Sequence, residues 1–447
     1  MTTFLELNKT KKILALGILF LFNFAPAIAQ KPIIQTKFTA DPAPMVHNDT
    51  IFLYTSHDED DATGFKMLDW LLYTSTDMVN WTDHGVVASL KNFTWAKQDN
   101  GAWAVQCIER NGKFYLYCPM HGGGIGVLVS DSPYGPFKDP IGKKLINDDH
   151  VWNDIDPTLF IDDDGQAYLY WGNPDLYYVK LNEDMISYSG EIVKEPTKPK
   201  NYQEGPWAWK KNKHYYMAYA STCCPEGIGY AMSNSPLGPW EYKGMIIDAS
   251  KKTNGNHPGI IDYKGKSYCF GFGYDLLKQE TTVHSERRSI DVDVMNYNED
   301  GTIQNLPYFT NDGPEQIETL NPFRRIEAET MAWSKGVKTD KSKETGMYVT
   351  QINNGDFIQV RGVDFADGAK KMEIIAASLN AGTVEVRLDK EDGDIIGISK
   401  IENTGGWQNW KTFKTKVKKV SGVHDLFFVF KGGQGDLFNF DAWKFSK

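Results

Sequence analysis

The chain has 447 residues, which predicts two or three domains that each bury a core of their own. Its 48 Lys and Arg residues against 58 Asp and Glu residues give a formal net charge of −10. No basic excess exists to neutralise a phosphate backbone, which argues against nucleic acid as a partner. Hydrophobic residues make up 41% and charged residues 24%, as in ordinary globular proteins, so a disordered chain is not expected. An aromatic share of 13% favours an all-β protein, because such rings fill β-cores and also stack on sugars.

The N-terminal segment has the features of a signal peptide. Lysines precede the apolar run Ile13–Phe22, and a stretch of small residues ends at Ala29. Residues 1–29 are therefore predicted to be removed, the alternative being a short uncleaved anchor. No later segment approaches the roughly 18 consecutive apolar residues that span a bilayer. We expect a secreted or periplasmic protein with no membrane partner after cleavage.

Five cysteines are too few for a disulfide scaffold in a chain of this length. Cys223 and Cys224 are adjacent, so they form either a vicinal disulfide or two packed thiols, and the sequence leaves both open. A C-x-x-C spacing is absent, and a structural zinc is not expected.

A polar turn followed by a short aromatic strand recurs five times, and the copies end at Tyr54, Tyr117, Tyr170, Met217 and Phe270. A second motif, Ser-x-Ser-Pro-x-Gly-Pro followed by an aromatic residue, occurs at 130–137 and again at 233–240. Units of about 50 residues with several strands are typical of propeller blades, each of which buries its faces only against its neighbours. We predict a five-bladed β-propeller over residues 30–316.

The repeat fades after about residue 300, and the polar stretch 310–316 marks a boundary. From Phe323 onward, strand-like alternation resumes without the repeat, at 356–360, 383–388 and 426–430. Short strands with Gly-rich turns over 323–447 predict a separate β-sandwich of the jelly-roll kind.

Three carboxylates lie at comparable points of different repeats, and each is followed within two residues by Pro. They are Asp41, Asp156 and Glu204. Glycoside hydrolysis needs one carboxylic acid to protonate the leaving oxygen and one carboxylate to activate water. Blades that each supply one carboxylate to a shared pocket suit this chemistry. The alternative is that these segments are only turn formers.

Four segments, in this order and spacing, resemble the motifs of glycoside hydrolase family 43: 40–44, 154–158, 204–207 and 256–259. The resemblance covers residues 37 to about 310. It implies a five-bladed propeller that hydrolyses xylose- or arabinose-containing polysaccharides with inversion. It also implies that Asp41 is the general base, Glu204 the general acid, and Asp156 the residue that orients the acid and keeps it protonated.

The same resemblance assigns residues that bind substrate. His257 matches a position that points to the propeller axis and often contacts a water-coordinated calcium, and the alternative is a core histidine. Either Arg287 or Arg288 lines the pocket, since adjacent strand residues face opposite ways, and the family pattern favours Arg288. Trp103 matches the motif of the second blade in part, and Trp207 neighbours the proposed acid.

The C-terminal segment resembles carbohydrate-binding module family 6 over about 323–447. The motifs are 325–330, 354–357, 404–408 and 437–443. The resemblance implies a structural calcium held by Glu327, Glu329 and Asp441, because hard cations prefer such oxygens. It also implies a sugar site with Trp407 and Asn439, in which Gln351 stands where the family has an aromatic partner.

Together these observations predict an exported inverting glycoside hydrolase that acts on arabinoxylan-type hemicellulose. The preferred activity is that of an exo-acting α-L-arabinofuranosidase. One alternative is a β-1,4-xylosidase acting on xylo-oligosaccharides. Another is a non-catalytic carbohydrate-binding protein with a vestigial propeller. Calcium is the expected cofactor, in the C-terminal module and possible at the propeller axis near His257, and no obligatory protein partner is evident.

Overall fold

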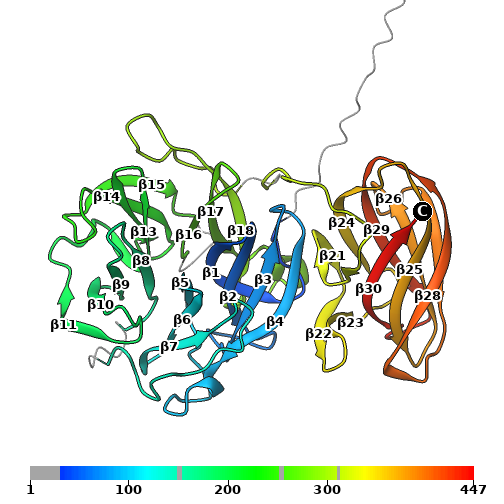
Figure 1. Ribbon diagram of the computed structural model, residues 1–447, viewed down its shortest axis with the longest axis horizontal. Coiled ribbons are helices and arrows are strands. Elements are labelled where there is room, and N and C mark those ends of the chain that lie inside the picture. Colours follow the sequence, from blue (N-terminus) through cyan, green and yellow to red (C-terminus); the bar gives the residue numbers. More distant parts are fainter. Residues whose placement is uncertain (1–30, 148–153, 251–255, 310–312) are drawn as a thin grey trace, which may run out of the picture.

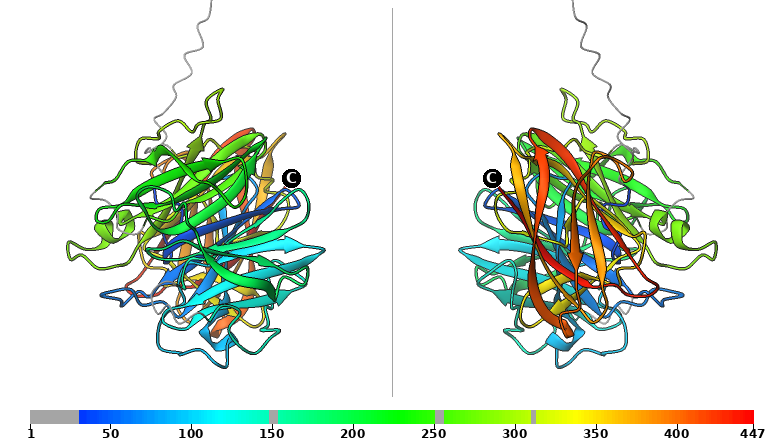
Figure 2. Two further views of the ribbon diagram at one scale, coloured as in Figure 1. Left: turned by 90° about the vertical axis from the view of Figure 1, so that its left-hand side faces the viewer. Right: turned by 90° about the vertical axis from the view of Figure 1, so that its right-hand side faces the viewer.

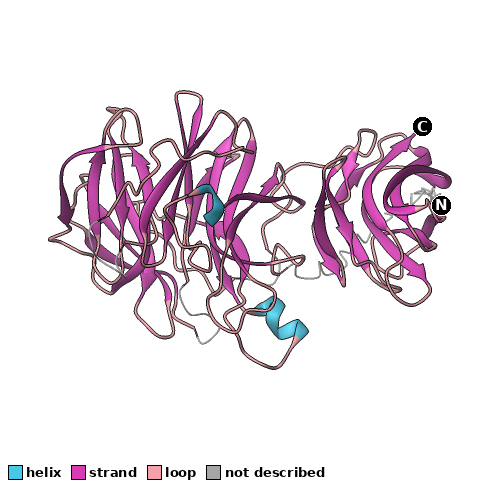
Figure 3. Ribbon diagram, turned by 90° about the horizontal axis from the view of Figure 1, so that it is seen from below, coloured by secondary structure: helices cyan, strands magenta, loops and turns pink. Residues whose placement is uncertain are grey.

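The computed structural model describes residues 31–147, 154–250, 256–309 and 313–447. These residues form two bodies built almost wholly of strands, which lie side by side (Figure 1, Figure 3). The blue-to-green body is the predicted propeller, and the yellow-to-red body is the predicted sandwich. The predicted signal peptide, residues 1–29, lies outside the described residues. Within the described ranges, no helix is long and apolar enough to cross a membrane.

The first 18 strands form five antiparallel sheets, which are the five blades of the propeller. Blades 1 and 2 contain β1 (Phe38–His47), β2 (Thr50–Asp58), β3 (Asp69–Ser75) and β4 (Trp81–Ser89), then β5 (Gln106–Arg110), β6 (Lys113–Met120) and β7 (Gly124–Ser130). Blade 3 contains β8 (Thr158–Ile161), β9 (Ala167–Trp171), β10 (Tyr177–Leu181) and β11 (Tyr188–Lys194). Blades 4 and 5 contain β12 (Tyr202–Lys211), β13 (His214–Ser221), β14 (Gly227–Ser233) and β15 (Glu241–Ile247), then β16 (Gly259–Tyr263), β17 (Lys266–Gly273) and β18 (Ser289–Met295). Two short helices, η1 (Leu90–Asn92) and α1 (Asp275–Glu280), interrupt the connections.

The propeller closes on itself through the first strand of each blade. β1, β5, β8, β12 and β16 contact one another in sequence, and β16 contacts β1 again. The starts of all five blades therefore surround one axis, as the repeat predicts.

The two repeated motifs join neighbouring blades. The hydroxyl groups of Tyr54 and Tyr170, which end the aromatic motif, donate hydrogen bonds to the carbonyls of Pro133 and Pro236 at 2.7 and 2.5 Å. Both prolines belong to the Ser-Pro motif of the next blade. The motifs recur because adjacent blades need the same link between a buried tyrosine and a turn carbonyl.

The second body, whose strands face the viewer on the right of Figure 2, is a sandwich of two antiparallel sheets. An apolar core lies between the two sheets. One sheet contains β22 (Lys338–Ser342), β23 (Gly346–Thr350), β30 (Asn439–Ser446), β25 (Ala369–Ser378) and β28 (Gly406–Val420), with β19 (Ile326–Glu327) paired to β30. The other contains β21 (Trp333–Lys335), β24 (Phe357–Asp364), β29 (Val423–Gly432), β26 (Gly382–Leu388) and β27 (Ile395–Ile401). This arrangement is the sandwich that the sequence predicts.

The two bodies share a sheet. The short strand β20 (Thr330–Met331), within the segment predicted to be the sandwich, pairs with β4 and extends blade 1. Near this contact, Thr339 Oγ1 donates a 2.6 Å hydrogen bond to Asp83 Oδ2, and both residues are buried. The sandwich is thus docked on blade 1 by backbone pairing and buried polar contacts.

Candidate active site

The starts of the blades converge on a cavity of about 440 Å³. Asp41 reaches it from β1, Asp156 from the residues before β8, Glu204 from β12 and His257 from the residues before β16. Arg288, directly before β18, is the fifth charged residue of the lining. The other lining residues are Phe65, Met67, Asn100, Trp103, His121, Ile155 and Asn173.

Asp41 and Asp156 share a backbone conformation that few non-glycine residues adopt, with φ of 52° and 58°. Each precedes a proline. In blade 4 the residue before Pro206 is Gly205, and its φ is also 58°. The carboxylate of blade 4, Glu204, therefore stands one residue earlier than those of blades 1 and 3. Left-handed conformations at non-glycine residues cost of order 1–3 kcal/mol and concentrate at functional sites.

The carboxylate of Asp41 is held from both sides. Ser56 Oγ donates to Asp41 Oδ2 at 2.6 Å, and Arg288 Nη1 donates to Asp41 Oδ1 at 3.1 Å. Arg288 is itself fixed by Asp58, which accepts hydrogen bonds from Nε at 3.0 Å and from Nη2 at 2.9 Å. All four side chains are buried, so this network fixes the direction in which Asp41 points.

The side chains of Arg287 and Arg288 lie on opposite sides of the backbone, as those of adjacent residues in an extended segment do. Arg288 is buried in the pocket, whereas Arg287 lies partly exposed and donates to Ser285 Oγ at 2.8 Å and to the carbonyl of Asp60 at 2.7 Å. The structure thus places Arg288, and not Arg287, in the pocket lining.

Asp156 of blade 3 is linked to Glu204 of blade 4 through the backbone amide of Gly205. The amide N–H of Gly205 donates to Asp156 Oδ2 at 3.1 Å, which places Asp156 against the residue that follows Glu204. Glu204 accepts a hydrogen bond from Asn173 Nδ2, and Gln203 Nε2 donates to Asn173 Oδ1 at 3.2 Å. Burial raises the pKa of Asp156, and Glu204 and Asp41 add to this while His257 opposes it.

His257 lies between the three carboxylates. Its Nδ1 is 3.4 Å from Asp41 Oδ1, and its Nε2 is 3.6 Å from Asp156 Oδ2 and 3.4 Å from Glu204 Oε1. Burial alone lowers the pKa of His257, but Asp156, Asp41 and Glu204 raise it to about 10. The three carboxylates therefore favour the protonated form of His257, whose positive charge offsets part of the negative charge of the pocket.

The imidazole ring lies between the two carboxylates proposed for acid and base. Its two 3.4 Å contacts place Asp41 Oδ1 and Glu204 Oε1 at most about 9 Å apart, which is an upper limit and lies within the roughly 6.5–9.5 Å of inverting glycosidases. A water can stand on the side of Asp41 while a leaving oxygen lies near Glu204.

Aromatic rings form part of the pocket wall. Trp103 stacks on His121, with ring centroids 4.1 Å apart and an angle of 17° between the planes. Phe65 is 43% exposed and lies over the Arg288 guanidinium, whose central carbon is 5.1 Å from the ring centroid. Trp103 and Phe65 thus offer surfaces for the apolar face of a sugar.

Trp207 lines a smaller cavity that Asp41, Asp156 and His257 also line. It is 7% exposed, packs in the core of the propeller, and donates from Nε1 to the carbonyl of Ile260 at 3.0 Å. It lies outside the lining of the main pocket. Glu204, three residues earlier in β12, faces the pocket, and the register of the strand shifts between the two residues.

Comparison with known proteins decides which family this site belongs to. Residues 29–303 match the family model described as glycosyl hydrolases family 43, and residues 327–447 match carbohydrate binding module (family 6). The chain is 35% identical to an arabinoxylan arabinofuranohydrolase of Bacillus subtilis, over 93% of this chain and 92% of that protein. The chain belongs to glycoside hydrolase family 43. It is a glycoside hydrolase with a family 6 module.

Two further comparisons agree. An arabinoxylan arabinofuranohydrolase of Paenibacillus polymyxa is 34% identical over 93% of this chain and 74% of that protein. The crystal structure of a family 43 arabinoxylan arabinofuranohydrolase from Bacillus subtilis, in complex with cellotetraose, superposes with a TM-score of 0.84 at 33% identity, covering 94% of this chain and 98% of that chain. The likeness therefore extends over both the propeller and the module.

Several residues in and behind the pocket of this family 43 enzyme were not singled out by the sequence. His121 and Asn173 line the pocket, and Asp58 holds Arg288 from outside the lining. All three follow, three or four positions later, the tyrosine that ends the repeated aromatic strand. The ends of these second strands lie at the same edge as the starts of the first strands, because the two are antiparallel. Polar residues just after the repeated tyrosine were the signal that could have found them.

The predicted calcium ligands of the module are Glu327, Glu329 and Asp441, and two of them contact Arg325. Arg325 donates to both carboxylate oxygens of Glu327, and to Asp441 Oδ2 at 2.7 Å. Glu329 Oε2 and Asp441 Oδ1 are buried and accept no hydrogen bond from any described residue. Buried oxygens of this kind need a partner, and a hard cation bound by Glu329 and Asp441 would supply one.

The predicted sugar site of the module is brought together in part. Asn439 Nδ2 donates to the carbonyl of Trp407 at 2.8 Å, and Thr350 Oγ1 donates to Asn439 Oδ1 at 2.8 Å. Gln351 follows Thr350 and is exposed. Both polar ends of the Asn439 amide are thus engaged within the protein.

The surroundings of His257 fit a directly bound calcium poorly. Asp156, Glu204 and His257 offer three ligand atoms within 4.8 Å of one another. However, calcium takes oxygen ligands in proteins, and one of these three groups is an imidazole ring. The trio is therefore better described as an ion-pair cluster.

Proposed function

We propose that this enzyme is an exo-acting α-L-arabinofuranosidase that removes arabinose side chains from arabinoxylan-type hemicellulose. The observation that carries the proposal is the similarity to arabinoxylan arabinofuranohydrolases along both the propeller and the module. The cavity of about 440 Å³ has a size suited to a small ligand such as a terminal sugar. We also propose residues 30–316 as the catalytic part and 323–447 as the part that binds polysaccharide.

The proposed reaction divides the work between two carboxylates. Asp41, oriented by Ser56 and Arg288, takes a proton from a water that attacks the anomeric carbon. Glu204 gives its proton to the glycosidic oxygen as the carbon–oxygen bond breaks, and the product has inverted configuration. Asp156 positions Glu204 through the Gly205 amide and His257.

The remaining assignments support this role. The signal-peptide features of residues 1–29 suit secretion or export to the periplasm. A calcium between Glu329 and Asp441 would stabilise the module, with Glu327 as the third proposed ligand. Trp407 and Asn439 mark the face of the module where we propose that xylan binds.

Product identification tests the substrate. The enzyme is incubated with wheat arabinoxylan, linear xylo-oligosaccharides and arabinan, and the products are separated and identified. We expect free arabinose from arabinoxylan with the xylan backbone left intact. Xylose released from the linear oligomers would move the assignment to a β-1,4-xylosidase, and binding without any product would favour a non-catalytic propeller.

Two variants test the roles of the carboxylates. Glu204→Gln is expected to reduce kcat on arabinoxylan by about 10²–10⁴-fold, and to reduce it much less on a nitrophenyl arabinofuranoside, whose leaving group needs little protonation. Asp41→Asn is expected to reduce both, because every substrate needs the attacking water. Glu183→Gln, an exposed residue outside the pocket lining, is the matched control. Equal losses on both substrates with Glu204→Gln would contradict its role as the acid.

A further inference from the structure

The adjacent cysteines, left open by the sequence, form a disulfide in the structure. Cys223 and Cys224 are bonded and both are exposed, in the loop that joins β13 to β14. A bridge between neighbouring residues closes no loop of the chain, so it adds little to stability by restricting the unfolded state. A surface position and a weak structural role leave the function of this disulfide to be explained.

The register of blade 4 places this loop beside the proposed acid. β13 runs antiparallel to β12, with Ala220 opposite Glu204. The amide of Thr222, just before the disulfide, donates to the carbonyl of Asn201, just before β12, at 3.0 Å. The disulfide is therefore held at the edge of the sheet where Glu204 enters the pocket.

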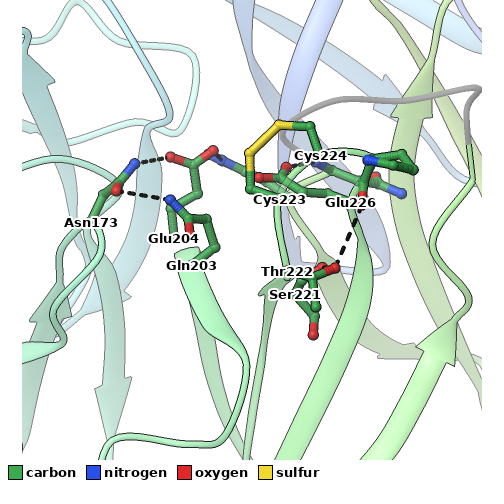
Figure 4. The surroundings of a disulfide bond; sticks show 11 residues. Asn173, Gln203, Glu204, Ser221, Thr222, Cys223, Cys224 and Glu226 are labelled. Atoms are coloured by element: carbon green, nitrogen blue, oxygen red, sulfur yellow. Dashed lines mark hydrogen bonds and ion pairs between the residues drawn. A yellow bond between two sulfur atoms is a disulfide. The ribbon is translucent and has the colours of Figure 1, made fainter.

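Figure 4 shows the same relationship with side chains. Glu204, Gln203 and Asn173 belong to the surroundings of the Cys223–Cys224 bond, and Asn173 is hydrogen-bonded to the other two. The cysteines are absent from the lining of the 440 Å³ cavity, to which Glu204 and Asn173 belong. The disulfide thus lies outside the pocket, next to its Glu204 wall.

The loop between β13 and β14 is also held in place at its second end, near Glu226. Glu226 is buried and accepts a 3.1 Å hydrogen bond from the amide of Asn256, the residue before His257. The loop is tied to blade 4 at one end and to the start of blade 5 at the other. Its position relative to the pocket is therefore set by the same residues that set the site.

The proposed reaction indicates which part of the substrate lies beside the disulfide. A general acid protonates the oxygen of the leaving group, so the leaving sugar must lie on the side of Glu204, beyond the pocket that holds the sugar being released. The disulfide offers two polarisable sulfurs and two methylene groups with no hydrogen-bond donor. Such a surface suits the apolar C–H face of a sugar ring.

We propose that the Cys223–Cys224 disulfide forms a subsite for the leaving group, in which it packs against the face of the xylose residue that carries the arabinose. Gln203 and Asn173, which are hydrogen-bonded to each other, lie beside this subsite. This rests on the proposed function, and it makes the loop a determinant of preference for polymer over small substrates.

The test compares two substrates that share the released sugar and differ in the leaving group. The double variant Cys223→Ser, Cys224→Ser and the wild-type enzyme are assayed on arabinoxylan and on a nitrophenyl α-L-arabinofuranoside. We expect the variant to show about a tenfold higher KM on arabinoxylan, which corresponds to about 1.4 kcal/mol. On the nitrophenyl substrate, kcat/KM is expected to stay within about twofold, because its leaving group is not a xylose.

Reduction provides an independent arm with an internal control. A water-soluble phosphine converts the disulfide to two thiols, with water supplying the two protons and the phosphine becoming its oxide. This treatment should reproduce the rise in KM in the wild type and change nothing in the double variant. Thermal unfolding of both proteins checks that the variant is folded.

The outcomes separate the two proposals. An unchanged KM on arabinoxylan, or an equal loss on both substrates, overturns the leaving-group subsite, and the equal loss would point to support of Glu204 instead. If the wild type releases no arabinose from either substrate, the proposed function itself fails.

Discussion

Arg288 Nη1 donates a hydrogen bond to Asp41 Oδ1 at 3.1 Å, across 247 positions of the sequence. The other edge of the guanidinium is paired with Asp58, which also accepts from the backbone amide of Arg288 at 2.8 Å. Arg288 and Asp58 are 4% and 0% exposed, so neither charge is compensated by water. The orientation of the proposed base therefore depends, through Arg288, on Asp58, which lies outside the lining of the pocket.

Asp58→Asn is expected to remove the charge that holds Arg288. Leaving a buried guanidinium with less compensation costs about 3–5 kcal/mol of stability, and Asp41 loses its fixed donor, so kcat should fall with KM little changed. Urea unfolding and steady-state kinetics measure the two effects. Asp262→Asn, which breaks the exposed pair with Lys211, is the control and should cost less than about 1 kcal/mol. Equal stabilities of the two variants would contradict the expectation.

Gly205 is the second position where a small change should disable the site. A Cβ at this residue would lie 2.7 Å from Cγ and Cδ2 of His257, and φ is +58°. Gly205→Ala is expected to displace His257 from the carboxylates and to lower kcat/KM by at least tenfold. Gly265→Ala is the control, since its φ is +80° and nothing lies within 4 Å, so it carries only the backbone cost of about 1 kcal/mol. Activity in Gly205→Ala equal to that of the control would show that His257 tolerates the shift.

The fold was predictable from the sequence because the repeated residues make the same contact in different blades. The tyrosines at Tyr54 and Tyr170 recur since each must reach a turn carbonyl of the next blade. The Asp-Pro pairs were visible for the same reason, because a left-handed residue before a proline begins the blade at a fixed place. Both features are local in sequence, and local features are what a single sequence displays best.

The rest of the site depends on contacts that no local pattern encodes. Asp58 and Asn173 act through partners far away in the chain, and Trp207, three residues after Glu204, packs in the core of the propeller. The pairing of β20 with β4 also escaped prediction, since two residues of strand carry no periodicity. In each case the decisive fact is which side of a strand meets which neighbour.

The contact between the two bodies should contribute to the stability of both. Asn80 Nδ2 donates to the carbonyl of Arg361 at 3.0 Å, and the amide of Arg361 donates to Asn80 Oδ1 at 2.9 Å. Asn80→Ala leaves both backbone groups of Arg361 without that partner, at a cost of about 1–3 kcal/mol. Calorimetry should show a lower Tm, with the propeller and sandwich still melting together. Two separated transitions in the wild type would contradict the coupling.

Removal of calcium should destabilise the module. Metal that binds only the folded state at about 100 times its Kd adds about 2.7 kcal/mol, so a chelator is expected to lower the Tm and added calcium to restore it. Glu329→Gln should abolish this response, because Glu329 Oε2 is one of the two buried oxygens without a partner among the described residues. Glu402→Gln, at an exposed position, should keep it. A wild-type Tm that does not change when the chelator is added would show that Glu329 Oε2 and Asp441 Oδ1 have another partner.

Acid should destabilise blade 1 through His84. Burial lowers the pKa of His84 to about 4, although Asp83 acts in the opposite direction, and its Nε2 lies 2.8 Å from Thr74 Oγ1. Between pH 6.5 and 4 the unfolded chain binds a proton at this residue that the folded chain does not, so the free energy of unfolding falls as the pH drops through this window. His84→Gln keeps a polar partner for Thr74 and removes the titration. Urea unfolding at several pH values is expected to show a shallower acid-side slope in the variant than in the wild type, and identical slopes would mean that His84 takes up its proton in the folded state as readily as in the unfolded chain.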